Sequence, residues 1–498
     1  MKTKLLLFLL FSLLLTTSKA QKRNLSKTQV EQDLEFLTTI LNENASYVYL
    51  NDYDFQKDFE NYLQTIHDSV PLENFGLFLT KSIGKIGDRH SYIKGFSIDS
   101  LFLPFMYAPL HQKVVVLDLN TNMALRILHP KFPYLKKIDG MPIEDFLKKI
   151  RPEDLMAPEE TYFTRAVRDI RDIQKNYKLL GKTLPEEIKL RLTDATFQND
   201  TTIIVSPVEK AVRFRPWDEE FGRNYILVKD EDYNNPEIIK PLFRIEDNIA
   251  YIKLPALPDE EEAPQLFEKV NTVMKSIKDK SRALIIDLRS NGGGTRDLMY
   301  EFAKYLVHPD SVYVINATKQ RGPIPLPKDY KEGLNTRFLY AFSELNPIEQ
   351  KRITAFLKTF KPRYVLDDSK YSEYYFGLFN GKKLTEPDFY YDKPVYILAN
   401  EKTFSAASVF VAAFKGVPNV HIVGVTTDGS SGNSERFELP NSQLRGKIST
   451  MVSFQKDGKI FDGFGTEPDI KIERDIDQVL WKSDSQLEKV RILILNQK

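Results

Sequence analysis

The stretch Ala283-Leu284-Ile285-Ile286-Asp287-Leu288-Arg289-Ser290-Asn291-Gly292-Gly293-Gly294 decides the fold class of this chain. Its first six residues are almost continuously apolar, which is typical of a strand that is buried on both faces. Three successive glycines follow, and they let the backbone turn sharply while its N–H groups face outward. An amphipathic helical pattern begins a few residues later. The stretch therefore predicts a strand, a tight turn and a helix.

Apolar strands and amphipathic helices alternate on both sides of this stretch. The further candidate strands are 249–254, 395–398 and 420–423, and the candidate helices are 266–277, 299–306 and 406–414. Such alternation indicates a mostly parallel sheet with right-handed crossovers. Residues 313–390 interrupt it with aromatic and helical patches. They are too long for a plain loop, so we interpret them as an insertion.

A second strand-to-helix junction, Thr403-Phe404-Ser405-Ala406-Ala407, follows the strand 395–398. A serine at this position can present its hydroxyl beside the free N–H of Ala406 and the positive end of the helix dipole. Serine is also a common helix N-cap, and this segment alone favours the cap. Likewise, the glycine turn by itself fits either a site that stabilises an oxyanion or a tight turn with no catalytic role.

Four segments in order resemble the C-terminal processing (tail-specific) serine protease family. They are Asp287–Gly294, Thr403–Ala407, Val423–Gly432 and Gly463-Phe464-Gly465-Thr466-Glu467-Pro468-Asp469-Ile470. The resemblance implies a crotonase/ClpP-like α/β catalytic domain, in which Ser405 is the nucleophile. It further implies an oxyanion hole made by the N–H groups of Gly293 and Ala406, with Gly292 as a possible contributor.

The general base is less directly implied. Many members of this family use a Ser–Lys dyad, but Ser430 stands where that lysine would be, in Asp428-Gly429-Ser430-Ser431-Gly432. The tricorn-like branch uses an upstream histidine instead, and Gly87-Asp88-Arg89-His90-Ser91 resembles its Asp-x-His segment. A neutral imidazole can accept a proton near pH 7 without special tuning, so we expect His90 to be the base.

Several other residues were weighed for this site. Asp462 aligns with the carboxylate that orients the histidine in the tricorn-like branch, although it equally fits a turn in a hairpin. Glu467 is the reserve candidate for that role. Lys402 is a weaker rival for the base, and Asp88 is expected to shape the histidine loop.

We predict an α/β multidomain chain with these segments: a signal peptide, 1–20; an N-terminal helical domain with the His loop, 21–98; a PDZ-like β module with a helical insertion, 99–210; a catalytic domain with the insertion 313–390, 211–475; and a C-terminal tail helix, 476–498. The helical domain rests on apolar residues at helical spacing, such as Val30, Leu34, Leu37 and Leu41. The PDZ-like module rests on short β-rich runs and on a turn at Asp139-Gly140.

Residues 1–20 have the charged, apolar and small-residue order of a secretory signal peptide. We therefore expect an exported protein, periplasmic or extracellular, without stable membrane insertion. With 70 basic and 69 acidic residues the chain is nearly neutral, which gives no reason to expect nucleic acid as a partner. It has no cysteine, which excludes disulfides and thiol nucleophiles.

Together these features predict a serine peptidase that hydrolyses peptide bonds through an acyl-enzyme, with no metal or cofactor. Peptide or protein substrates are expected, including unfolded or C-terminal segments, and the oligomeric state is left open. Two alternatives remain. One is an inactive relative that holds peptides, which the missing lysine at Ser430 keeps open. The other is an acyl hydrolase that acts on small esters.

Overall fold

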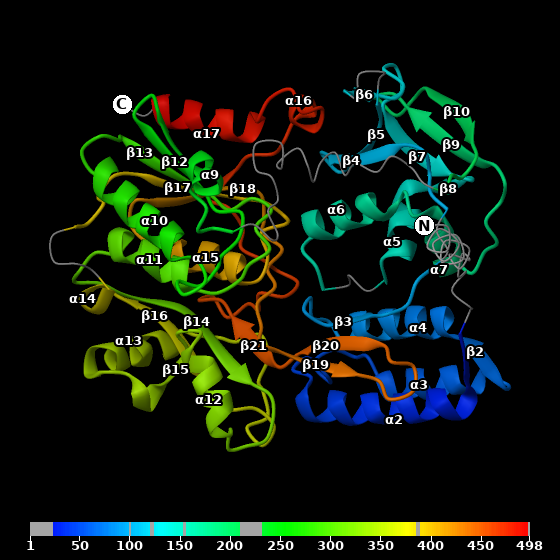
Figure 1. Ribbon diagram of the computed structural model, residues 1–498, viewed down its shortest axis with the longest axis horizontal. Coiled ribbons are helices and arrows are strands. Elements are labelled where there is room, and N and C mark those ends of the chain that lie inside the picture. Colours follow the sequence, from blue (N-terminus) through cyan, green and yellow to red (C-terminus); the bar gives the residue numbers. More distant parts are fainter. Residues whose placement is uncertain are drawn as a thin grey trace, which may run out of the picture.

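The computed structural model describes residues 23–98, 101–119, 124–152, 156–209, 232–384 and 389–496. The expected signal peptide, 1–20, lies outside these ranges. Figure 1 shows two halves side by side. One holds the parallel sheet and its helices, and the other holds an antiparallel sheet above a group of N-terminal helices. The multidomain α/β architecture predicted from the sequence is confirmed.

A six-stranded sheet forms the centre of the first half. Its order is β11 (Phe243–Glu246), β12 (Ile249–Lys253), β13 (Ala283–Asp287), β17 (Val395–Ala399), β18 (Val420–Gly424) and β22 (Ile470–Lys471). β12 to β22 are parallel and β11 is antiparallel to β12. Every residue of β12, β13 and β17 is buried, as expected for a parallel sheet covered on both faces.

Helices cover this sheet from both sides (Figure 1). One face packs against α10 (Pro264–Ile277), α11 (Asp297–Leu306) and α15 (Ala406–Phe414), and the other packs against α17 (Ser485–Asn496). The side chains alternate along β13: Leu284 and Ile286 belong to the first core, whereas Ala283 and Ile285 belong to the second. The apolar stripe predicted for 299–306 is buried at Met299, Phe302, Ala303 and Leu306.

The segment 313–390 contributes to a second, antiparallel sheet. That sheet consists of β15 (Tyr340–Ala341), β16 (Tyr375–Asn380), β14 (Val312–Gln320) and β21 (Met451–Phe454), flanked by α12 (Lys328–Asn335), η3 (Phe342–Glu344), α13 (Pro347–Leu357) and α14 (Gly381–Leu384). β14 pairs with β21 from the C-terminal part of the chain. The segment 313–390 is thus hydrogen-bonded, through β21, to the C-terminal part of the chain.

Residues 101–209 form a seven-stranded antiparallel sheet with three helices against it. The strands are β4 (Met106–Leu110), β5 (Lys113–Leu119), β6 (Leu125–Ile127), β7 (Tyr134–Ile138), β8 (Met141–Pro142), β9 (Ile188–Thr193) and β10 (Asp200–Val205); the helices are α5 (Ile143–Ile150), α6 (Glu159–Asp169) and α7 (Ile173–Leu179). Asp139 and Gly140 form the predicted two-residue turn between β7 and β8, both with positive φ.

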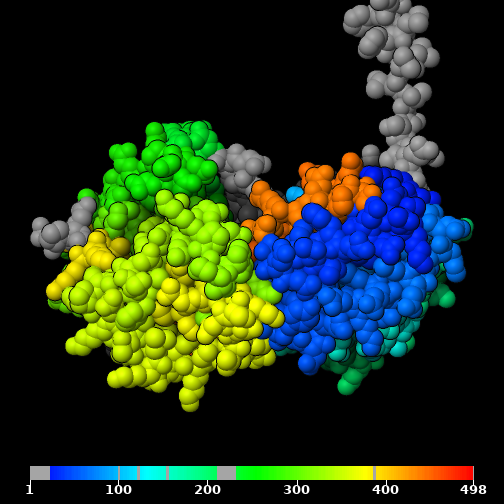
Figure 2. All heavy atoms as spheres, turned by 90° about the horizontal axis from the view of Figure 1, so that it is seen from below, coloured from blue at the N-terminus to red at the C-terminus, as the bar shows by residue number. Residues whose placement is uncertain are grey.

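The N-terminal region contains β1 (Asn24–Ser26), α2 (Lys27–Asn44), α3 (Phe55–Gln64), β2 (Ser69–Pro71), α4 (Leu72–Lys85) and β3 (Tyr92–Lys94). The predicted apolar face Val30, Leu34, Leu37 and Leu41 is buried. β3 pairs with β20 (Arg445–Ser449), which pairs with β19 (Ser434–Glu438). Figure 2 shows this C-terminal segment, in orange, seated against the N-terminal helices, in blue. The pairing brings the loop before β3 toward the half that holds the parallel sheet.

Short helices complete the described chain: α9 (Pro236–Ile239), η2 (Lys240–Leu242) and α16 (Ile476–Val479). None of the helices within the described ranges combines the length and apolar character needed to cross a bilayer.

Candidate active site

Ser405 lies between β17 and α15 in a conformation that is unusual for serine. Its φ is 55° and its ψ is −127°, and it immediately precedes the first residue of α15. A non-glycine residue in such a sparsely populated region carries about 1–3 kcal/mol of strain. Its side chain makes no capping hydrogen bond. Ser405 thus stands at the N-cap position, but its side chain does not cap the helix. Its hydroxyl instead lies 3.1 Å from Nε2 of His90.

The two signature segments of the sequence hold each other in place. Asn291 O accepts a hydrogen bond from the Phe404 N–H at 2.9 Å, and Leu288 O accepts one from the Thr403 hydroxyl at 3.0 Å. The Ser290 N–H donates to Oδ1 of Asn400 at 2.8 Å. Because these bonds join adjacent strand ends, the glycine turn is fixed against the backbone that carries the serine.

The glycine turn passes so close to Ser405 that a side chain at Gly293 has no room. A Cβ there would lie 2.8 Å from Cβ of Ser405 and 3.0 Å from the backbone N of Ala406, and φ at Gly293 is +94°. Only glycine fits this combination of contact and conformation.

The oxyanion donors differ in part from the prediction. The N–H of Gly293 donates to Oδ1 of Asn291 at 2.8 Å, so in this structure it is engaged and is not free for an oxyanion. By contrast, the Ala406 N–H, at the start of α15, has no acceptor among the described residues. Gly292 is exposed, with open space around it. The structure therefore leaves Ala406 as the donor best placed beside Ser405.

His90 is presented by a tight loop between α4 and β3. Oδ1 of Asp88 accepts hydrogen bonds from the backbone N–H groups of His90, at 2.9 Å, and Ser91, at 2.7 Å. Asp88 thus shapes the loop, as expected. The Ser91 hydroxyl in turn accepts from the Ser449 N–H of β20 at 3.0 Å. The imidazole is buried, and its ring centroid lies 4.9 Å from that of Phe404.

Asp462 is close to His90 but is connected to it through Ser430. Nδ1 of His90 lies 2.6 Å from the Ser430 hydroxyl, which donates to Oδ1 of Asp462 at 3.2 Å. Asp462 also accepts from the Arg89 N–H and the Tyr47 hydroxyl, at 3.0 and 3.1 Å. Asp462 therefore reaches His90 only through Ser430, which lies between them.

Ser430 was singled out in the sequence only as the position where a lysine was missing. Its location in the loop that carries the lysine of the Ser–Lys members is a signal that its side chain enters the site. What that side chain contacts depends on residues 340 positions away, and the sequence does not show it.

The remaining candidates do not reach the imidazole. Both nitrogens of His90 have serine partners, Ser405 and Ser430. Glu467 lines a separate cavity beside Lys415 and Lys456. Within the described ranges the Ser405 hydroxyl is hydrogen-bonded to His90 and not to Lys402.

Burial shifts the two titratable groups of this network in opposite directions. Burial, with the nearby charges of Lys447 and Arg89, lowers the pKa of His90 to about 3. Burial and the charge of Asp88 raise the pKa of Asp462 to about 7, against hydrogen bonds that lower it. His90 is thus neutral at neutral pH, whereas Asp462 changes charge in the physiological range.

A cavity of about 540 Å³ opens beside Ser405. It is lined by Ser405, Ala406, Val409, Gly294–Asp297, Asp259–Glu261, Thr336, Arg337, Ser431, Gly432 and Met451. In the part of the chain that the structure describes, no group of three or more His, Asp or Glu side chains could hold a metal ion.

Comparison with known proteins covers both sequence and fold. Residues 248–472 match peptidase family S41. An uncharacterized protein of Chlamydia muridarum (strain MoPn / Nigg) is 24% identical over 257 residues, which cover 46% of this chain and 40% of the relative. A protein of Chlamydia trachomatis serovar D is 23% identical over 250 residues, covering 46% and 41%. The matches therefore span only about two fifths of the length of these curated relatives.

The fold is shared over nearly the whole chain with solved structures of CPAF. Mature CPAF complexed with lactacystin superimposes with a TM-score of 0.62 at 16% identity, covering 94% of this chain and 98% of that chain. Mature CPAF alone gives 0.61, also at 16% identity, covering 95% and 98%. At this identity the likeness is one of fold. The family match identifies residues 248–472, which carry Ser405, as a domain of the peptidase family S41 type.

Proposed function

We propose that this protein hydrolyses peptide bonds through an acyl-enzyme on Ser405, with His90 as the general base. The observation that carries the proposal is the 3.1 Å contact between the Ser405 hydroxyl and Nε2 of a neutral, buried histidine. A nucleophile and a base within hydrogen-bonding distance, with the base oriented by a third group, are what nucleophilic catalysis by serine requires. The strained backbone at Ser405 adds support, because such strain gathers at functional sites.

The hydrogen bonds favour one position for the imidazole proton. Ser430 donates to Asp462, so its oxygen is left to accept from Nδ1 of His90. Nε2 is then unprotonated and faces the Ser405 hydroxyl. Ser430 thus orients His90, and ionised Asp462 stabilises the imidazolium through it.

The reaction follows from this arrangement. As Oγ of Ser405 attacks the peptide carbonyl carbon, His90 takes its proton. The oxyanion accepts a hydrogen bond from the Ala406 N–H, and the positive end of the α15 dipole stabilises its charge. When the tetrahedral intermediate collapses, the C–N bond breaks and His90 gives the proton to the leaving amine. Water, activated by the same imidazole, then hydrolyses the acyl-enzyme and regenerates Ser405.

The antiparallel module and the N-terminus suggest where the enzyme works and how it holds its substrate. Residues 101–209 are proposed to be PDZ-like and to hold an extended peptide by strand addition. An edge strand, β10, with Ile204 57% exposed, supports this role. Export is proposed from the order of residues 1–20.

A serine-directed fluorophosphonate probe tests the catalytic assignment. We expect the wild type to be labelled and both Ser405→Ala and His90→Ala to lose labelling. Loss in Ser405→Ala alone would move the base elsewhere, with Lys402 as the next target. A folded wild type that is not labelled would favour the inactive peptide-binding relative.

The class of substrate needs a second assay. Small esters and unstructured peptides are offered side by side to wild type and Ser405→Ala. Serine-dependent peptide cleavage supports the proposal, whereas turnover of esters alone would favour the acyl hydrolase.

A further inference from the structure

Arg296 is a buried cation beside the nucleophile, and among the described residues no side chain is recorded as its partner. It lies just before α11, is 6% exposed and lines the same cavity as Ser405. Its Nη1 is buried without a hydrogen-bond partner, and no carboxylate within the described ranges forms an ion pair with it. A guanidinium carries five N–H donors, and leaving them unpaired away from water is expensive.

The surroundings of Arg296 carry further unpaired polar atoms. The side-chain oxygen and nitrogen of Asn316, a fully buried residue of β14, also lack partners. A Cβ at Gly377 would lie 2.6 Å from Oδ1 of Asn316 and 3.7 Å from Nη1 of Arg296, so the two side chains flank the same glycine. Buried polar groups are normally satisfied, so unsatisfied ones next to Arg296, which lines the Ser405 cavity, indicate that a ligand or water belongs near this guanidinium.

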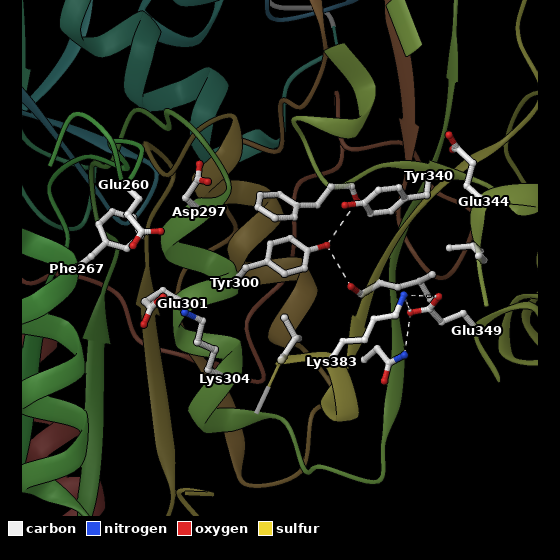
Figure 3. A pocket seen from close by; sticks show the side chains of 15 residues that line it. Glu260, Phe267, Asp297, Tyr300, Glu301, Lys304, Tyr340, Glu344, Glu349 and Lys383 are labelled. Atoms are coloured by element: carbon white, nitrogen blue, oxygen red, sulfur yellow. Dashed lines mark hydrogen bonds and ion pairs between the residues drawn. The ribbon is translucent and has the colours of Figure 1, made fainter. Parts of the chain in front are cut away.

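The neighbouring cavity shows the contrast. It shares Glu260 and Asp297 with the Ser405 cavity and has a volume of about 420 Å³. Figure 3 shows that Lys383 points toward Glu349, and their ion pair is 2.8 Å long. Lys304 likewise pairs with Glu301 at 2.6 Å. The cations of that cavity are neutralised by the protein itself, whereas Arg296 is not.

The charges around Arg296 favour an anion. Burial lowers the pKa of Arg296 to about 10, with Tyr300 and Arg337 as the other groups that act on it, so it stays cationic at neutral pH. Arg337 lines the same cavity and bonds only to a backbone carbonyl, Gly333 O, at 2.7 Å. Carboxylates also line this cavity: Asp259, Glu260, Glu261 and Asp297. They are exposed or half-buried, and solvent screens them more than it screens Arg296.

We propose that Arg296, assisted by Arg337, is an anion-binding subsite that selects substrates with a carboxylate close to the scissile bond. The carboxylate is either an acidic side chain or the free C-terminus of the peptide. The fork of the guanidinium matches a carboxylate with two parallel hydrogen bonds, and the site is dry enough to make these bonds strong. This proposal rests on the proposed peptidase function of Ser405, and it specifies the class of substrate that Ser405 would cleave.

Matched peptides test the subsite. Each pair differs only by Glu against Gln at one position near the cleavage site, or by a free against an amidated C-terminus. We expect kcat/KM to favour the carboxylate member of at least one pair by about 10- to 100-fold, the range of one charge-assisted buried contact. The pair that shows the preference identifies the source of the carboxylate. Equal cleavage within every pair would overturn the proposal while leaving the peptidase function intact.

Variants tie the preference to Arg296. In Arg296→Gln we expect the acid-to-amide ratio to fall to within about threefold of one, and in Arg296→Lys, which keeps the charge but not the fork, to an intermediate value. Arg491→Gln, at a half-buried position of α17 that does not line the Ser405 cavity, is the matched control and should keep the wild-type ratio. Fluorophosphonate labelling of Ser405 shows that each variant has an assembled site. A ratio unchanged in Arg296→Gln would sink the proposal.

Binding separates this inference from catalysis. The same peptide pairs are titrated calorimetrically into Ser405→Ala, with and without Arg296→Gln. We expect about 10- to 100-fold tighter binding of the carboxylate member only where Arg296 is present. This result is expected even if the protein proves to be an inactive relative, so a failure of the peptidase function and a failure of the subsite give different outcomes.

Discussion

Two fully buried aspartates of this molecule, Asp287 and Asp462, have pKa values that move in opposite directions. Burial alone would raise both. At Asp287 the positive charges of Arg289 and Lys253 more than offset burial and hold the pKa well below its usual value. At Asp462 no such cation forms an ion pair within the described chain, and the pKa rises to about 7.

The two networks differ in how completely their charges are paired. Arg289 bonds to both Asp287 and Asp484, at 2.7 and 2.6 Å, and Lys253 reaches Asp287 at 3.2 Å. At the active site only neutral donors hold Asp462. The comparison teaches that a closed ion network stabilises the strand end that carries the glycine turn, whereas the catalytic network keeps a proton available for exchange.

Breaking the closed network should have the largest effect. Arg289→Met leaves Asp287 and Asp484 buried without their main cation, and we expect a loss of about 3–5 kcal/mol of unfolding free energy. The control Arg491→Met removes exposed ion pairs to Glu246 and Asp247 and should lose less than about 1 kcal/mol. Urea unfolding followed by circular dichroism measures both. Equal losses in the two variants would contradict the comparison.

Breaking the catalytic network should instead affect the rate. Ser430→Ala removes the acceptor of His90 Nδ1, and we expect kcat/KM to fall by about 10²–10³-fold with a smaller change in stability. Ser281→Ala, a buried serine away from the site, is the control. Ser430→Thr keeps a hydroxyl and should retain more activity than Ser430→Ala. Full activity in Ser430→Ala would show that His90 is oriented without this residue.

The ionisation of Asp462 should be visible in activity. Ser430 needs an ionised acceptor, so we expect kcat/KM to rise with pH through about 7 and Asp462→Asn to lose this limb. A pH–rate profile measures it. If the rise of kcat/KM with pH persists unchanged in Asp462→Asn, the titrating group is not Asp462.

The same ionisation should be visible in stability, with the sign set by the raised pKa. The folded pKa, about 7, exceeds the unfolded value of about 3.9, so the stabilising contribution is complete below the unfolded value and is lost as pH rises through about 7. The Asp462→Asn variant has no carboxyl group to ionise, so it does not lose this stability as pH rises. Its stability relative to wild type should therefore increase by about 1–3 kcal/mol between pH 5 and pH 8, measured by thermal or urea unfolding at both pH values. A constant difference would mean that Asp462 titrates normally.

The smallest expected effect concerns backbone strain at the nucleophile. Ser405→Gly relieves the positive φ but makes the unfolded chain more flexible, so we expect a net gain of about 1 kcal/mol. Ser405→Ala keeps the strain and should stay near wild-type stability. Differential scanning calorimetry compares the two variants, both of which are inactive. Equal melting temperatures would argue against stored strain.

Local sequence was sufficient for the strand–turn–helix unit that lies against Ser405. The apolar run of β13, the turn at Gly293 and the stripe of α11 are encoded within about twenty residues, because hydrophobic periodicity and glycine conformation act locally. The resemblance added the order of the segments. It indicated Ser405, His90 and Asp462, which the structure brings into one hydrogen-bonded network.

Other features of the site needed the folded chain. Asn291 engages the N–H of Gly293, which corrected an oxyanion donor, and Ser430 separates His90 from Asp462. Arg296 reads in the sequence as an ordinary residue before a helix, and only its burial without a partner distinguishes it. Each of these depends on which side chains are neighbours in space.

By itself, the sequence determined the strand–turn–helix units and their parallel arrangement, because short-range periodicity and backbone preference specify them, whereas Ser405 was indicated by the family resemblance. Only the tertiary structure placed His90 beside Ser405. His90 lies 315 residues from Ser405 and outside the family-matched segment 248–472, and the pairing of β3 with β20 brings it there. Tertiary structure also decided the protonation of the two buried aspartates. Burial and neighbouring groups, not residue type, set the pKa of Asp287 and of Asp462.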